Sequence, residues 1–168
     1  MNEDLIFGTI FGFFLWAAYD WLVRRTREEE ERRRAFKVLL DELHDITERC
    51  NDNITTIHEE ISKLHPTAPL FVSTLIPLSA LGWESLRSTG ISVTLDANTL
   101  GRLYVIYNQV DTHNKLMTLR ERYIGSDVPT SIQPTYIKDY DEKLLKTLES
   151  IKTEIGVVEP EVKRRADC

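Results

Sequence analysis

The sequence predicts an all-α protein in which one membrane-spanning helix continues through a charged stalk into an antiparallel helical bundle. Three observations lead to this fold class. Residues 5–23 are almost entirely apolar, residues 24–34 are almost entirely charged, and most of the remaining chain repeats its apolar residues at helical spacing. We therefore expect four regions: a transmembrane anchor (1–23), a charged helical stalk (24–34), a cytoplasmic helical bundle (35–156) and a polar tail (157–168).

Length and composition fit one domain beyond the anchor. The chain has 168 residues and a net charge of −6, with both signs mixed after the anchor. Such a balance lacks the basic surface that nucleic-acid binding requires, so we expect no nucleic-acid partner. Two cysteines, Cys50 and Cys168, are too few for a disulfide framework. We expect both to be free thiols in a reducing compartment.

The predicted membrane anchor reads LIFGTIFGFFLWAAYDWLV. As a helix, these residues would extend about 28 Å, close to the thickness of the hydrocarbon core of a bilayer. A cleaved signal peptide is a poorer match, because the preceding residues are acidic and no suitable cleavage site follows. A buried core helix is also a poorer match, because the run is apolar on every face.

Basic residues on one side of the anchor predict its orientation. Arg24, Arg25 and Arg27 follow the span, and nothing basic precedes it. By the positive-inside rule, the N-terminus lies outside and the bulk of the chain is cytoplasmic at the cell membrane. This orientation makes glycosylation of the Asn53-Ile54-Thr55 sequon unimportant.

Two features within the span invite a functional interpretation. Asp20 is an acid near the inner end, and such acids often serve proton transfer or charge pairing. Its spacing from Arg24 favours an ion pair at the level of the membrane interface. Gly8 and Gly12 lie on one face, which predicts close packing of two such helices, although pairs of this kind also arise by chance.

The stalk alternates its charges at the spacing of a helix turn. Each pair contributes only about 0.2 to 0.5 kcal/mol, but together the pairs favour a solvated helix. Six pairs at four-residue spacing are expected: Arg24 with Glu28, Arg25 with Glu29, Arg27 with Glu31, Glu28 with Arg32, Glu29 with Arg33, and Glu30 with Arg34.

The stalk continues into an amphipathic helix without a breaker. Apolar residues recur every seven positions from Phe36 to Leu64, and others widen the stripe. Pro66 and Pro69 end the helix. Three further helices are predicted over residues 79–89, 96–124 and 136–155, closed by Gly90, Gly125 and Gly156, with Asp96 as an N-cap. Residues 70–78 and 91–95 are weak candidates for strands.

Two stretches resemble a known group of proteins. They read LIPLSALGWESLRSTG and LDANTLGRLYVIYNQVDTHN. This pattern resembles small prokaryotic, single-pass, membrane-anchored helical proteins of unassigned function, with a short Trp-bearing helix, a glycine stop and a Leu/Tyr-rich helix. The resemblance implies a helical fold and a membrane context. The positions that match this pattern are Trp83, Gly90, Leu103, Tyr107 and Asn114.

No residue pattern indicates catalysis or a cofactor. Asp41 and His44 have a spacing used in di-iron bundles, but no second such motif exists. His44 and His58 are about 21 Å apart along one helix and cannot share a metal. Cys50 lies on the apolar stripe and is interpreted as a core thiol. We therefore expect no catalytic site, no metal and no cofactor.

Two residues are left with more than one interpretation. Trp83 is expected to anchor the core, with ligand stacking as the alternative. His113 is expected either in a polar cluster with its neighbours or as a cap or buried hydrogen-bonding group.

The sequence favours a membrane-tethered interaction module, such as a scaffold, adaptor or sensor, without catalytic activity of its own. Its expected partners are the lipid bilayer and either another protein or a second copy of the chain. One alternative is an accessory subunit of a larger membrane complex. Another is a membrane-associated sensor or enzyme that binds a ligand through His113, Tyr107 and Trp83.

Overall fold

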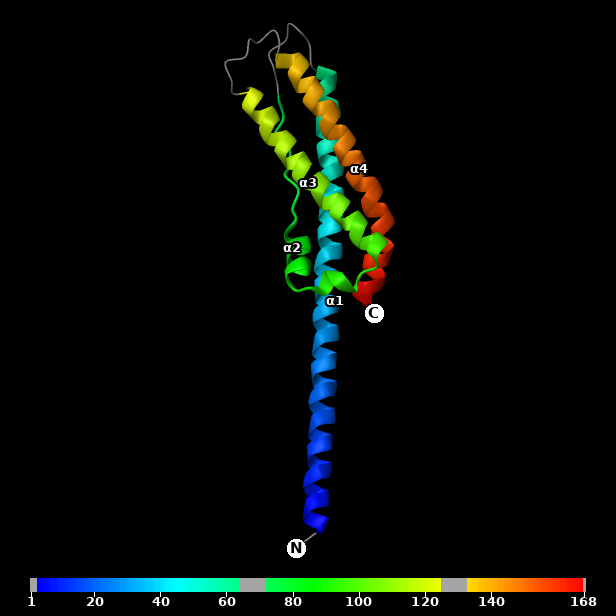
Figure 1. The fold of residues 1–168 in the computed structure, drawn as a ribbon. Coiled ribbons are helices and arrows are strands. Elements are labelled where there is room, and N and C mark those ends of the chain that lie inside the picture. Colours follow the sequence, from blue (N-terminus) through cyan, green and yellow to red (C-terminus); the bar gives the residue numbers. More distant parts are fainter. Residues whose placement is uncertain (1–2, 64–71, 125–132, 168) are drawn as a thin grey trace.

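The structure, a computed structural model, is built of helices (Figure 1). It describes residues 3–63, 72–124 and 133–167, and within these the side chains of residues 13–63, 72–122 and 135–167. No strand occurs in the described ranges, and the predicted all-α class is confirmed. The elements are α1 (Glu3–Lys63), α2 (Leu81–Ser88), the 3-10 helix η1 (Ile91–Thr94), α3 (Ala97–Ile124) and α4 (Gln133–Asp167).

Helix α1 is one rod whose first half stands clear of the bundle (Figure 1). Its 61 residues correspond to about 90 Å. Neither proline nor glycine interrupts it between residues 13 and 63. The buried stripe begins at Phe36, which is 2% exposed, and continues through Leu39 and Leu43. The helix therefore becomes amphipathic next to Ala35, as the sequence predicts.

The first eight residues of the predicted membrane span lie where side chains are not described. These residues, 5–12, include Gly8 and Gly12. Among the side chains that are described, no helix is long and apolar enough to cross a lipid bilayer. The span therefore stays a prediction.

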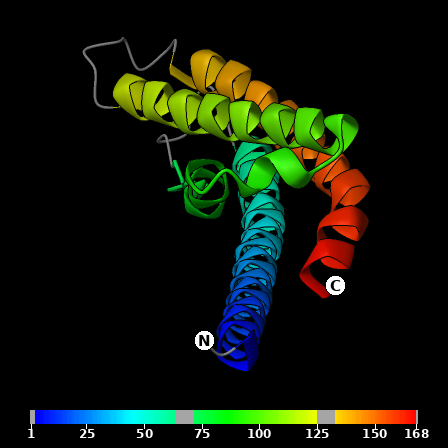
Figure 2. The same ribbon diagram turned by 60° about the horizontal axis from the view of Figure 1, so that its bottom comes forward.

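Three long helices form the bundle, with α4 packed against both α1 and α3. Figures 1 and 2 show that α4 runs opposite to the other two, whereas α1 and α3 run in the same direction. Both closely packed pairs of long helices, α1 with α4 and α3 with α4, are therefore antiparallel. Helices α1 and α3 run the same way because residues 72–80 return along the bundle in an extended conformation before α3 begins.

Neither weak strand candidate becomes a strand in the described ranges. Residues 72–80 are extended but have no neighbouring strand, and residues 91–94 form η1. Gly90 has φ +72°, the left-handed conformation that the predicted glycine stop requires. Asp96 caps α3 as predicted, because its Oδ1 accepts the N–H groups of Asn98 and Thr99 at 3.0 Å each. These hydrogen bonds, those of Thr99 above all, lower the pKa of Asp96.

Helix α4 continues past its predicted end. Gly156 was expected to close the helix and residues 157–168 to form a polar tail, but α4 runs to Asp167 and includes Pro160. The prediction is wrong because Val158 and Val162 continue the buried stripe, at 1% and 0% exposure. Packing of this face against the core outweighs the helix-breaking tendency of glycine and proline.

The extension of α4 predicts unequal effects of two neighbouring valines. Val158→Ala removes two buried methyl groups and is expected to lower the free energy of unfolding by about 2 kcal/mol. Val157, 51% exposed, is the matched control, and Val157→Ala should change it by less than about 0.5 kcal/mol. Urea denaturation measures both, and equal effects would contradict a packed C-terminal turn.

Candidate functional site

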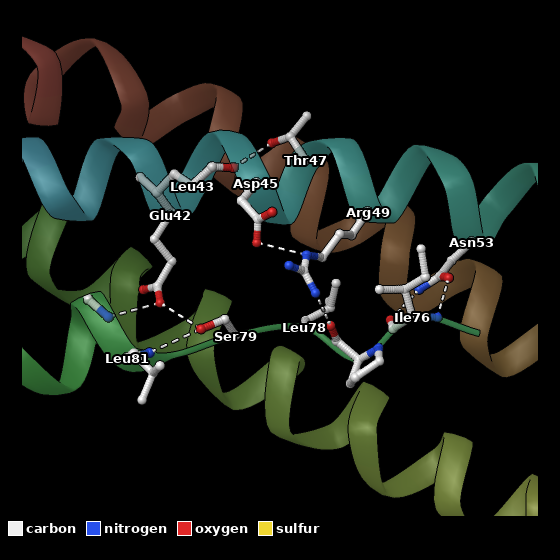
Figure 3. A network of polar contacts seen from close by, with 12 residues as sticks. Glu42, Leu43, Asp45, Thr47, Arg49, Asn53, Ile76, Leu78, Ser79 and Leu81 are labelled. Atoms are coloured by element: carbon white, nitrogen blue, oxygen red, sulfur yellow. Dashed lines mark hydrogen bonds and ion pairs between the residues drawn. The ribbon is translucent and has the colours of Figure 1, made fainter. Parts of the chain in front are cut away.

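The most distinctive site is the set of side chains that hold the extended segment, residues 72–80. Asn53 on α1 bonds both backbone groups of Ile76: its Nδ2 donates to the carbonyl at 2.8 Å and its Oδ1 accepts the N–H at 2.8 Å (Figure 3). Asn114 on α3 makes the same two hydrogen bonds with Leu78: its Nδ2 donates to the carbonyl at 2.9 Å, and its Oδ1 accepts the N–H at 3.0 Å. Each side-chain amide thus replaces the neighbouring strand that the segment lacks.

A third side chain holds the segment at a proline, where only the backbone carbonyl needs a hydrogen-bond partner. Arg49 donates from its guanidinium to the carbonyl of Pro77 at 3.1 Å (Figure 3). Proline has no N–H, so a single donor satisfies it. Arg49 is itself placed by Asp45, one helical turn away at 2.8 Å.

Glu42 ties the end of the segment to α2 and α3. Its carboxylate accepts the backbone N–H groups of Gly82 and Trp83 at 2.9 and 3.0 Å. It also accepts the Ser79 hydroxyl at 3.2 Å (Figure 3). The Tyr107 hydroxyl donates to it at 2.7 Å. A carboxylate suits this place, because the first N–H groups of a helix lack partners. A Cβ at Gly82 would lie 3.1 Å from Glu42 Oε2, so glycine allows this close approach.

Trp83 is buried beside this carboxylate. Its side chain is 3% exposed and stacks on Tyr107, with ring centroids 5.2 Å apart and planes 3° from parallel. Burial, and then the negative charge of Glu42, raises the pKa of Tyr107 far above its usual range. The structure therefore places Trp83 in the core, and the Tyr107 hydroxyl acts as a hydrogen-bond donor.

A buried charge cluster holds the other end of the segment. Arg120 on α3 donates to Glu60 on α1 at 2.5 Å, to Asp141 on α4 at 2.7 Å and to the Ser73 carbonyl at 3.1 Å. Glu60 also accepts the Ser73 N–H at 3.0 Å. All three ionisable groups are at most 2% exposed. Burial raises the pKa of Asp141 to about 6; Arg120 opposes this rise and Glu60 adds to it.

His113 lies in the bundle interior, where it contacts Asn53 of α1. It is fully buried, and Asn53 Nδ2 lies 3.4 Å from its Nε2. Since Nδ2 can only donate, Nε2 accepts and the proton resides on Nδ1, which has no partner in the described part of the chain. Burial lowers the pKa of His113 to about 4, so the ring is neutral at physiological pH. The buried hydrogen bond is the alternative that the structure shows.

The other residues considered in the sequence analysis lie in different parts of the structure. Asp20 Oδ2 and Arg24 Nε form the predicted ion pair at 2.9 Å. The position of this pair at the level of the membrane interface stays a prediction. Cys50 is buried, and burial raises the pKa of its thiol to about 12, which suits a core thiol. His44 is exposed and pairs with Glu159 at 3.0 Å, and His58 is exposed as expected. Cys168 lies outside the described residues.

The polar members of the core were missed, although the spacing contains a signal for them. On α1 the buried stripe falls at 36, 39, 43, 46, 50, 53, 57 and 60, alternating by three and four, and Glu42 is buried beside it. Asn53 and Glu60 therefore occupy core positions of the same stripe. Asp141 does so on α4, and Arg120 on α3. A polar residue at such a position must find a buried partner, and this argument would have identified the network.

The side chains around the extended segment hold its backbone in place. In the part of the chain that the structure describes, no three His, Cys, Asp or Glu side chains are placed to hold a metal ion. Comparison of the chain with models of protein families, with curated proteins and with solved structures finds no match. Function must therefore be inferred from the chain's own residues.

The double hydrogen bond of Asn53 predicts a large loss of stability when it is removed. Asn53→Ala leaves an N–H and a carbonyl of the segment without a partner, and the expected destabilisation is about 2 to 4 kcal/mol. Asn51→Ala, an exposed amide two residues away on α1, should cost less than about 0.5 kcal/mol. Denaturant unfolding compares the two, and similar midpoints would refute the role of Asn53.

The buried Asp141 predicts a specific pH dependence. Folding raises the pKa of Asp141 from 3.8 to about 6. Between these two pH values, Asp141 is therefore protonated in the native state and ionised in the unfolded state. Its contribution to stability is thus full below pH 3.8 and is lost as the pH rises through 6. Acidification through this window should therefore stabilise the wild type relative to Asp141→Asn.

Unfolding by urea at several pH values tests this difference. His113 has a lowered pKa and contributes the opposite slope, destabilising the fold on acidification from pH 6.5 towards 4. That contribution is the same in both proteins and cancels when their free energies are subtracted. Parallel curves for the two proteins would show that Asp141 titrates normally.

Proposed function

We propose that this chain is a membrane-tethered helical interaction module whose anchor and binding domain share one helix. The observation that carries the proposal is the continuity of α1 from Glu3 to Lys63, through an apolar, a charged and a buried part. Seven large apolar side chains of its free part are 55% to 69% exposed: Phe13, Phe14, Leu15, Trp16, Tyr19, Trp21 and Leu22. An exposed apolar surface of this size marks a site that contacts another molecule or a membrane. A lipid bilayer suits an apolar helix with tryptophan and tyrosine near one end.

The stalk would act as a spacer between the membrane and the bundle. Its eleven residues correspond to about 17 Å of helix. Two of the six expected ion pairs are closed in this segment, Arg25 with Glu29 at 3.2 Å and Glu30 with Arg34 at 3.5 Å. With basic residues directly after the span, the bundle would lie on the cytoplasmic side and the N-terminus outside. Packing of two anchors through Gly8 and Gly12 belongs to the same proposal.

The state of the buried polar groups supports a binding or scaffolding role without catalysis of its own. The acidic, amide and guanidinium groups around the extended segment already bond to backbone or to one another, as Glu42, Asn53 and Arg120 show. Between α3 and α4, Arg102 bonds Glu154 at 2.7 Å and Gln109 bonds Ser150 at 2.8 Å. A protein partner or a second copy of the chain is the expected ligand.

Membrane fractionation tests the proposal. The full chain should stay with membranes after alkaline extraction, whereas a fragment from Glu30 to Cys168 should be a soluble, folded monomer. Phe14→Arg places a charge near the centre of the span, costs about 2.5 to 3.5 kcal/mol of insertion energy and should release part of the protein.

The matched control puts the same charge on an exposed apolar residue of the bundle. Val93 is 79% exposed, and Val93→Arg should remain with the membrane. Release of the wild-type chain by alkaline extraction would overturn the anchor, and a dimeric fragment would place self-association on the bundle.

A further inference from the structure

A groove rich in arginine lies at the base of the bundle, where the stalk enters it. It has a volume of about 240 Å³ and is lined by Glu29, Arg32, Arg33, Phe36, Thr94 and Arg165. These residues come from α1, η1 and the last turn of α4. Figure 1 shows the C-terminal end of α4 beside α1 at this level. We call it the arginine groove. Three guanidinium groups and one carboxylate line it, although the chain as a whole is acidic.

Two carboxylates in or beside the arginine groove already form ion pairs, and one of these pairs includes Arg165 of the groove itself. Glu29, the one acid in its lining, forms its expected pair with Arg25 at 3.2 Å, whereas its other expected pair, with Arg33, is not formed. Glu161 is shared by Arg164 and by Arg165, which uses its Nε for this bond at 2.9 Å. Glu30 is paired with Arg34 at 3.5 Å, and Glu28 and Glu31 line a neighbouring groove with α2, which shares Arg32 with the arginine groove.

Arg32 and Arg33 line the arginine groove as cations that form no ion pair among the described residues. Neither has an acidic partner within 4.0 Å among the described residues, although the spacing of the stalk offers each of them one. Bringing guanidinium groups together is unfavourable unless an anion lies between them. Phe36, 2% exposed, gives the groove an apolar wall, which strengthens the attraction for such an anion.

We propose that the arginine groove binds a phosphate group, held chiefly by Arg32, Arg33 and Arg165. The planar guanidinium group donates two parallel hydrogen bonds to a phosphate, and several such groups from different helices suit its three oxygens. The phosphate can belong to a soluble phosphate ester or to the headgroup of an anionic lipid. This inference does not rest on the membrane anchor, because the groove is formed by the bundle and the adjoining stalk.

Calorimetric titration of the full chain in neutral detergent with inorganic pyrophosphate tests the site. Arg33→Gln and Arg165→Gln should each weaken binding by about tenfold or more, the effect of losing a charge-assisted hydrogen bond. Arg27→Gln is the matched control. It removes the same charge from the stalk, and Arg27 lines none of the described grooves, so screening should limit its effect to about twofold.

Two outcomes would overturn the proposal: no saturable binding of pyrophosphate up to roughly millimolar concentration, or an equal loss in all three variants. Circular dichroism confirms that each variant is folded. A second arm repeats the titration with phosphatidic acid in the micelles. Competition by this lipid would assign the phosphate to a headgroup, and unchanged pyrophosphate binding would assign it to a soluble ester; either result supports a phosphate site.

Discussion

The extended segment imposes the constraint on which the rest of the bundle depends. Residues 72–80 run between helices, no strand of the described ranges lies beside them, and several of their N–H and C=O groups are partly buried. Such groups must be paired, because an unpaired one costs about 1 to 3 kcal/mol. Asn53, Asn114, Arg49, Glu60 and Arg120 provide the partners.

The hydrogen bonds that hold the extended segment determine how the long helices are aligned. The segment is held by α1 through Asn53 and by α3 through Asn114, so a shift of either helix by one turn would break both bonds of its amide. The cluster of Glu60, Arg120 and Asp141 adds α4 to the same alignment. Buried ion pairs contribute little net stability, because desolvation offsets their attraction. We infer that their main effect is to specify one register among several that apolar packing alone would permit.

The same helix links this alignment to the proposed anchor. Since α1 carries both the exposed apolar part and the residues that hold the segment, the bundle cannot rotate about the stalk without bending an uninterrupted helix. A tether of this kind would present the bundle at a set height and orientation above the membrane. The arginine groove lies at the junction of stalk and bundle, where a bound anion would meet both.

The sequence by itself determined the features that depend on local chemistry. The apolar, charged and amphipathic parts of α1, the left-handed Gly90 and the cap at Asp96 follow from residues a few positions apart. Helical period and backbone sterics act over one or two turns, so a single stretch contains all the information needed.

The tertiary structure alone decided where α4 ends and which polar residues are buried. Gly156 and Pro160 signal a stop, but Val158 and Val162 reach the core and keep the helix intact. Asn53 has the sequence of a glycosylation site, yet its amide closes onto a backbone 23 residues away. Partners so distant in the chain are brought together by packing, and the burial of a polar group depends on the partner that packing supplies.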